Sequence, residues 1–254
     1  MSELLIPTIQ SSAIPRLGRQ DVHVWFCDLL RYADDRAALA GLLSSDEQTR
    51  AARFAFDRDR QRFTLSHGLL RIILAWHMGT EAPHLQFARG AHGKPTVSCA
   101  FAASQEIQFS LSHSGDYAVV AVATGRAVGV DLELRRPSVE TLKLAQRFFA
   151  AGESQVMEKV QGEAQQRLFY QYWTAKEAYL KGRGVGLSLG LDRFEILFDE
   201  QSSVARVRLT DSGTLDLAWC VRSLSVPDHL AGALAVEGEE CRVQMFDAAA
   251  CLRR

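Results

Sequence analysis

The chain of 254 residues presents the same order of secondary-structure signals twice. Each copy begins with a short alternating stretch, residues 21–27 and residues 127–134, which predicts a β-strand. Helical stretches that end in an Arg-Phe pair follow, and then come one long helix and several short strands. The repeat predicts an α+β fold in which two similar α/β subdomains form a pseudo-twofold monomer. The natural ligand site of such a molecule is the cleft between the subdomains.

The seam between the two copies lies near Gly125 and Arg126. We therefore expect a loosely ordered lead-in over residues 1–20, an N-terminal half over residues 21–125 and a C-terminal half over residues 126–254. Ser45, with Gln48 three residues later, predicts the capping box of a short helix. The long helices are expected over residues 57–78 and 163–181, each followed at once by glycine, which tolerates the left-handed conformation of a helix end.

Composition excludes several classes of partner. Lys and Arg number 29 against 30 Asp and Glu, so the overall charge indicates neither nucleic acid nor an anionic membrane as a partner. The five cysteines are scattered and lack a C-x-x-C pair, which argues against a zinc site or a disulfide framework and favours a reducing compartment. No secretory signal and no apolar stretch of membrane-spanning length is present, so we expect a cytoplasmic protein.

The stretch YQYWTAKEAYLKGRGVGLSLG, residues 170–190, carries the densest group of charged residues on a helix that is otherwise suited to burial. Glu177 follows Lys176 directly and precedes Lys181 by one helical turn. A surface ion pair between Glu177 and Lys181 is the simplest interpretation, and it would add only a few tenths of a kcal/mol to the stability of the helix.

The stretch VGVDLEL, residues 128–134, suggests a different role for Glu177. Alternation along the strand places Asp131 and Glu133 on one face. Two carboxylates on one face repel each other unless a cation joins them, and oxygen ligands suit Mg²⁺ better than Zn²⁺. Glu177 is the obvious third ligand. The alternative is that this end of the strand is exposed and that both acids face water.

Several residues of the first half are candidates for binding an anion. Ser112 and His113 lie just before a Gly-Asp turn, where hydroxyls, an imidazole and free amides can form an anion pocket. Lys94 lies in the tight turn HGKP. Arginines cluster between residues 50 and 71, and they either pair with neighbouring acids or bind phosphate through the planar guanidinium group.

Taken together, VGVDLE and YWTAKEAYLKGRGVGL resemble the paired signatures of the 4′-phosphopantetheinyl transferases. The chain length, the twofold order of parts and the GKP and SLSHS elements resemble the surfactin-synthetase-activating type, which is a pseudo-dimeric monomer. The resemblance runs from about residue 21 to residue 188 and implies transfer of phosphopantetheine from coenzyme A to a serine of an acyl or peptidyl carrier protein, with release of 3′,5′-ADP.

The resemblance also implies roles for individual residues. Mg²⁺ would be held against the pyrophosphate by Asp131, Glu133 and Glu177, and Lys181 and Lys176 would assist catalysis from the helix. The coenzyme A phosphates would be bound by Arg50, Arg53, Arg62, Lys94, Ser112, His113 and Lys181. Relatives often carry a basic residue one turn before Arg50, where this chain has Glu47. The general base is left open between Glu177, a metal-bound water and Lys181.

Two other functions are compatible with these residues. A non-catalytic module could bind coenzyme A or a carrier protein, although such a module has no need for three carboxylates. A metal-dependent nucleotide pyrophosphatase would use the same carboxylates but would need no protein acceptor.

Overall fold

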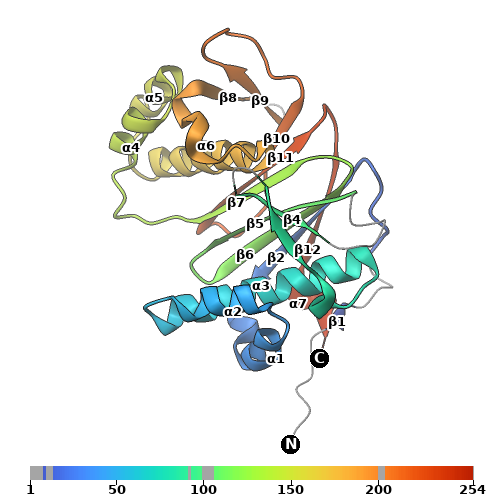
Figure 1. The fold of residues 1–254 in the computed structure, drawn as a ribbon. Helices are drawn as coiled ribbons and strands as arrows, with labels where there is room; N and C mark the ends of the chain where they lie inside the picture. The colour runs from blue at the N-terminus through green and yellow to red at the C-terminus, as the bar shows by residue number, and fades with distance from the viewer. Residues whose placement is uncertain (1–7, 10–13, 91–92, 99–105, 200–203, 254) are drawn as a thin grey trace, which may run out of the picture. The chain divides into compact units, whose positions relative to one another are not determined.

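The computed structural model describes residues 8–9, 14–90, 93–98, 106–199 and 204–253, and these residues form two compact units (Figure 1). Unit 1 comprises residues 1–89, 95–125 and 242–254, and unit 2 comprises residues 90–94 and 126–241. Each unit has its own hydrophobic core.

Unit 1 is built on a four-stranded sheet in the order β12-β2-β6-β5, in which only the β12–β2 pair is parallel. Leu69 and Ile73 of the long helix α3 share one core with Trp25 of β2 and Val120 of β6. The strands of unit 1 are β1 (Thr8–Ile9), β2 (Asp21–Asp28), β3 (Phe87–Arg89), β4 (Pro95–Val97), β5 (Ile107–Ser114), β6 (Tyr117–Thr124), β12 (Arg242–Asp247) and β13 (Leu252–Arg253). Its α-helices are α1 (Arg36–Gly41), α2 (Ser45–Ala52), α3 (Asp57–Met78) and α7 (Ala248–Cys251).

Unit 2 is built on a five-stranded antiparallel sheet in the order β7-β11-β10-β9-β8. The helix α6 packs on β7, β10 and β11, and its Tyr179 shares a core with Phe194 and Val221 of the sheet (Figure 1). The elements of unit 2 are β7 (Val128–Leu134), α4 (Thr141–Phe148), α5 (Ala151–Glu158), α6 (Gly162–Arg183), β8 (Phe194–Phe198), β9 (Val204–Leu209), β10 (Trp219–Ser223) and β11 (Leu230–Glu237).

The two units share one connectivity. In each, the first strand of the copy pairs antiparallel with the last strand of the meander that follows, β2 with β6 and β7 with β11. In each, a helix of 22 residues ends at a glycine in the left-handed conformation, Gly79 (φ 63°) after α3 and Gly184 (φ 65°) after α6. The predicted α+β class with two similar subdomains is confirmed.

Three sequence-based expectations differ from the structure. The segment from Arg242 onward, expected in the C-terminal half, belongs to unit 1 because β12 pairs with β2. The lead-in is anchored where it is described, since β1 pairs with β13 and Ile14 is buried. The capping box of α2 is formed by Ser44 and Glu47, one residue earlier than predicted.

None of the helices in the described parts of the chain combines the length and the apolar composition that a bilayer crossing requires.

Candidate active site

The backbones of β7 and α6 touch, and two glycines make this contact possible. A Cβ atom on Gly129 of β7 would lie 2.0 Å from the carbonyl oxygen of Ala178 and 2.2 Å from the amide nitrogen of Gly182. A Cβ atom on Gly182 would lie 2.5 Å from the ring of Trp219. A glycine inside a strand often marks such a close approach. The contact places the charged end of β7 beside the last turns of α6.

An ion pair joins β7 to α6 at this point. Asp131 is 3% exposed, and its Oδ1 lies 2.6 Å from Nζ of Lys181. Lys181 was expected either to form a surface pair with Glu177 or to bind phosphate. In the structure its ammonium is paired with the buried carboxylate of the neighbouring strand.

Glu177 lies within electrostatic reach of both acids of β7. Burial raises the pKa of Glu177, the charge of Asp131 raises it further, and Glu133 adds a smaller increase that Lys181 opposes. Across the sheet, Asp131 and Glu133 are paired with Ala233 and Ala231, whose small side chains leave the carboxylates room. The charges of the two predicted carboxylates of β7 therefore act on the third, Glu177.

The chemistry of this donor set fits a hard divalent cation. Asp131, Glu133 and Glu177 offer only carboxylate oxygens, the kind of ligand that Mg²⁺ favours, and Asp131 already holds one ammonium. Within the described residues no three His, Cys, Asp or Glu side chains already converge in a metal-holding arrangement. Binding would therefore require these side chains to move.

Lys176 is not part of this group, which corrects the catalytic role expected for it. Its side chain is 0% exposed and its Nζ lies 2.7 Å from Glu153 of α5. The same ammonium donates hydrogen bonds to the carbonyl oxygens of Leu191, at 2.8 Å, and Phe194. Glu153 in turn accepts from the amide of Ile196. Lys176 thus fastens α6 to α5 and to the start of β8, inside the core of unit 2.

Lys94 belongs to unit 2 and is half-buried. Its Nζ donates to the carbonyl oxygens of Val128 and Gly182, each at 2.9 Å. The ammonium of Lys94 is therefore bound to backbone carbonyl groups. The sequence had suggested that it binds phosphate.

The remaining predicted anion ligands lie in unit 1. Ser112 is buried and His113 is exposed, because neighbouring residues of β5 face opposite sides of the sheet. Nε of Arg62 lies 2.7 Å from Asp116 in the turn after β5, a partner that the sequence did not reveal. Arg53 is exposed at the end of α2, as is Arg50, whose guanidinium lies over the ring of Phe63 at 5.2 Å from its centroid.

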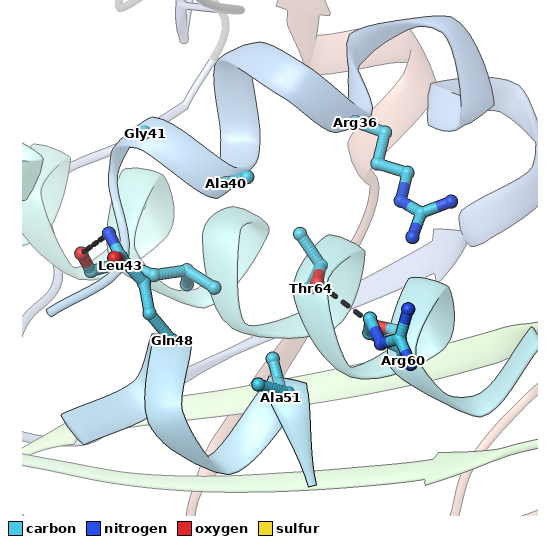
Figure 2. Close-up of a pocket in the computed structure, with 9 residues that line it drawn as sticks. Arg36, Ala40, Gly41, Leu43, Gln48, Ala51, Arg60 and Thr64 are labelled. Carbon is cyan, nitrogen blue, oxygen red and sulfur yellow. Dashed lines mark hydrogen bonds between the residues drawn. The ribbon is translucent and has the colours of Figure 1, made fainter. Parts of the chain in front are cut away.

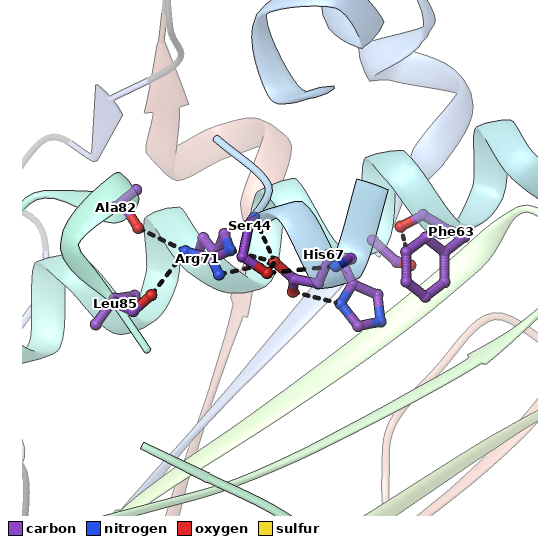
Figure 3. Close-up of polar contacts among 8 residues, drawn as sticks. Ser44, Phe63, His67, Arg71, Ala82 and Leu85 are labelled. Atoms are coloured by element: carbon purple, nitrogen blue, oxygen red, sulfur yellow. Dashed lines mark hydrogen bonds and ion pairs between the residues drawn. The ribbon is translucent and has the colours of Figure 1, made fainter. Parts of the chain in front are cut away.

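Glu47 of α2 is buried and joins a polar network with α3, whose members Ser44, His67 and Arg71 are labelled in Figure 3. Its carboxylate accepts from Arg71 at 2.7 Å, from His67 at 2.9 Å and from the amide of Ser44 at 2.9 Å. Burial raises the pKa of Glu47, but these hydrogen bonds and the charge of Arg71 outweigh burial and bring the pKa down to about 2. The acid that replaces the basic residue of many relatives therefore holds two helices together.

A cavity of about 720 Å³ opens between α1, α2 and α3 (Figure 2). Small side chains such as Ala40 and Ala51 line it, together with Arg36 and Arg60. Both arginines are bound to Asp57. None of the predicted site residues lines this cavity.

Comparison with known proteins accounts for both units. Residues 33–125 match the N-terminal family of 4′-phosphopantetheinyl transferases, and residues 127–235 match the 4′-phosphopantetheinyl transferase superfamily. The chain is 37% identical to the 4′-phosphopantetheinyl transferase HetI of Nostoc sp., over 86% of this chain and 88% of HetI. It is 39% identical to a putative 4′-phosphopantetheinyl transferase of Synechocystis sp., over 80% of this chain and 88% of that protein.

The 4′-phosphopantetheinyl transferase psf-1 of Bacillus pumilus is 33% identical over 81% of this chain and 92% of its own length. These matches cover most of each protein, and the family model that matches residues 127–235 spans β7 and α6. The chain belongs to the 4′-phosphopantetheinyl transferase family.

Proposed function

We propose that this protein transfers the 4′-phosphopantetheine group of coenzyme A to a serine of an acyl or peptidyl carrier protein, with Mg²⁺ bound by Asp131, Glu133 and Glu177. In the reaction the serine oxygen forms a bond to the phosphorus of the phosphopantetheine group. The pyrophosphate bond to 3′,5′-ADP breaks, and the serine loses its proton. The observation that carries the proposal is that Asp131 and Glu133 of β7 both raise the pKa of Glu177 on α6, in a chain of this family.

The metal would supply positive charge that neutralises the pyrophosphate in the transition state. The residues of the chain prepare this site before any ligand arrives. Glu177 is held beside Asp131 and Glu133 by the glycine contact between β7 and α6. Lys181 offers an ammonium that is bound to Asp131 and only partly buried, with 32% of its side chain exposed, so it can also meet an anion that the metal holds.

Arg50, Arg53 and His113 are the residues of unit 1 that we assign to the phosphates of the nucleotide. Their side chains are exposed, and a guanidinium is suited to bind phosphate through two parallel hydrogen bonds. Arg62 is bound to Asp116, so we assign it to holding the turn that follows β5, the strand that carries Ser112 and His113.

The decisive experiment is the intact mass of a purified apo carrier protein after incubation with this protein, coenzyme A and Mg²⁺. A gain of the mass of phosphopantetheine, with release of 3′,5′-ADP, establishes the reaction. Cleavage of coenzyme A without a carrier would favour a pyrophosphatase. Binding of coenzyme A without any product would favour a non-catalytic binding module.

We also infer that the protein works as a cytoplasmic monomer. The repeat within the chain supports a monomer, since a single chain already contains both subdomains. Among the described residues, Cys27, Cys220, Cys241 and Cys251 are free thiols. Sedimentation of the active protein tests the oligomeric state.

A further inference from the structure

Lys94 bridges two backbone segments of unit 2 at the place where they approach most closely. Its Nζ donates to Val128, the residue before Gly129, and to Gly182, whose amide a Cβ atom on Gly129 would strike. Each donor distance is 2.9 Å. The lysine therefore fastens β7 to α6 one residue from the glycine contact.

The position suits a cation. The carbonyl of Gly182 belongs to the last turn of α6, where carbonyl groups have no partner within the helix. A positive charge there also interacts favourably with the helix dipole. The stem of Lys94 passes close to the left-handed Gly184, whose added Cβ would lie 3.4 Å from Cδ of Lys94. This end of the helix therefore receives its cap from a residue far away in the sequence.

The surroundings of the amine support a fixed role. Burial lowers the pKa of Lys94 to about 8, against a smaller upward contribution from Glu237. The two carbonyl groups that bind the ammonium of Lys94 offset the cost of its burial. If the ammonium moved to an external anion, both carbonyl groups would lose their hydrogen-bond donor.

The segment that carries Lys94 also has an unusual place in the chain. Residues 90–94 belong to unit 2, whereas the flanking strands β3 and β4 belong to unit 1. Lys94 is therefore grouped with β7 and α6 rather than with the strands that flank it in sequence.

We infer that Lys94 is a positioning residue, which sets the distance between Asp131 and Glu133 on β7 and Glu177 and Lys181 on α6. The inference rests on the roles proposed above for those four residues. It replaces direct binding of phosphate, the role that the sequence suggested for Lys94.

Lys94→Met tests the inference because it keeps the length of the stem and removes all three donors. A shift of about 1 Å between catalytic groups can cost about 100-fold in rate, so we expect kcat for carrier modification to fall by about that factor. KM for coenzyme A should stay within about threefold of the parent value. The matched control is Lys143→Met, which removes an exposed lysine of the same unit, paired only with Glu140 among the described residues, and should change neither constant.

A rise in KM for coenzyme A with kcat preserved would overturn the inference in favour of a phosphate ligand. Hydrogen exchange gives an independent readout, since the amides of residues 180–184 should lose protection in Lys94→Met while those of β8 and β9 do not. Unchanged exchange would also count against the inference. If Lys94→Met cannot be purified, Lys94→Arg keeps the charge but not the spacing, and the same loss of kcat at constant KM is expected.

The effect of Lys94 should pass through Glu177. In a Glu177→Gln background, Lys94→Met should lower the residual rate by less than about threefold, because the group it positions is already gone. Full additivity would refute a positioning role. If Glu177→Gln alone leaves transfer intact, the proposed metal site is wrong, and that result is independent of the exchange data on Lys94.

Discussion

The ammonium of Lys181 lies 2.6 Å from Oδ1 of Asp131, so the last turn of α6 is joined to β7 by an ion pair at the edge of the candidate site. Lys181 was expected to serve either Glu177 or the substrate. The charges of Asp131 and Glu133 still raise the pKa of Glu177, against the opposing charge of Lys181, and a divalent cation near Glu177 would favour its ionised form.

Glu177→Gln should separate the metal site from a simple surface pair. As a ligand, Glu177 is needed to hold the cation, so kcat for carrier modification should fall by at least about 100-fold. Because the folded state raises the pKa of Glu177, its ionised form opposes folding at pH values above about 4.5, the ordinary value of the group, and the neutral variant should melt at the same or a higher temperature without metal.

The check combines the carrier-mass assay with melting curves recorded with and without Mg²⁺ and coenzyme A. Glu163→Gln is the control, since Glu163 lies on the same helix in an exposed pair with Arg167 and its loss should leave both stability and transfer near the parent values. Near-parental transfer by Glu177→Gln, with the Mg²⁺-dependent stabilisation intact, would falsify the three-carboxylate site.

Lys176→Met should damage stability far more than catalysis. It leaves the buried carboxylate of Glu153 without its partner, which typically costs about 3–5 kcal/mol. Urea titration measures the loss, and the rate per folded molecule should stay near the parent value. The double variant Lys176→Met with Glu153→Gln should recover part of the stability. A Lys176→Met protein that folds but has no activity would show that Lys176 takes part in catalysis.

Gly129→Ala should force β7 and α6 apart. The new Cβ atom would meet backbone atoms, so no side-chain rotation can relieve the overlap, and a cost of about 1–3 kcal/mol is expected together with a lower kcat. Gly232→Ala on β11 is the matched control, because the nearest atoms to its Cβ would lie at 3.4 Å. Equal effects of the two substitutions on kcat would show that the contact does not position the site.

Stability should fall as the pH drops below about 6.5, the ordinary pKa of a histidine. Burial lowers the pKa of His77 to about 3 and also lowers that of His23, whose ring lies 5.2 Å from the ring of His77. The unfolded chain therefore binds protons that the folded chain excludes, so each such histidine contributes a slope of at most about 1.4 kcal/mol per pH unit.

Urea titrations at pH 5 and pH 7.5 would measure this loss. His23→Phe should reduce the difference without loss of stability at pH 7.5, because the ring nitrogens of His23 have no hydrogen-bond partner among the described residues. The loss linked to Glu47 belongs to a lower window, from about 4.5 toward 2, because its pKa is depressed. A stability that is flat between pH 7.5 and pH 5 would contradict the burial of neutral histidines.

The sequence predicted those features that local patterns encode. The long helices and their terminal glycines follow from periodicity and from the left-handed preference of glycine, and the carboxylates Asp131 and Glu133 share a face because strands alternate. Lys176 was misjudged because its partner Glu153 lies 23 positions earlier on another helix, and no local pattern announces such a pair. Gly129 could have been predicted, because a glycine within a strand often marks the close approach of another backbone segment.

The parallel pairing of β12 with β2 has a consequence for the order in which the protein forms. Apart from its turn of residues 90–94, unit 2 is continuous in sequence, so its sheet can assemble as soon as residue 237 has left the ribosome. The sheet of unit 1 must wait for residues 242–247, more than 200 positions after the strand they join. The half that is translated first is therefore the half that is completed last, and during synthesis one side of β2 is an unpaired edge that a chaperone or a second chain can reach.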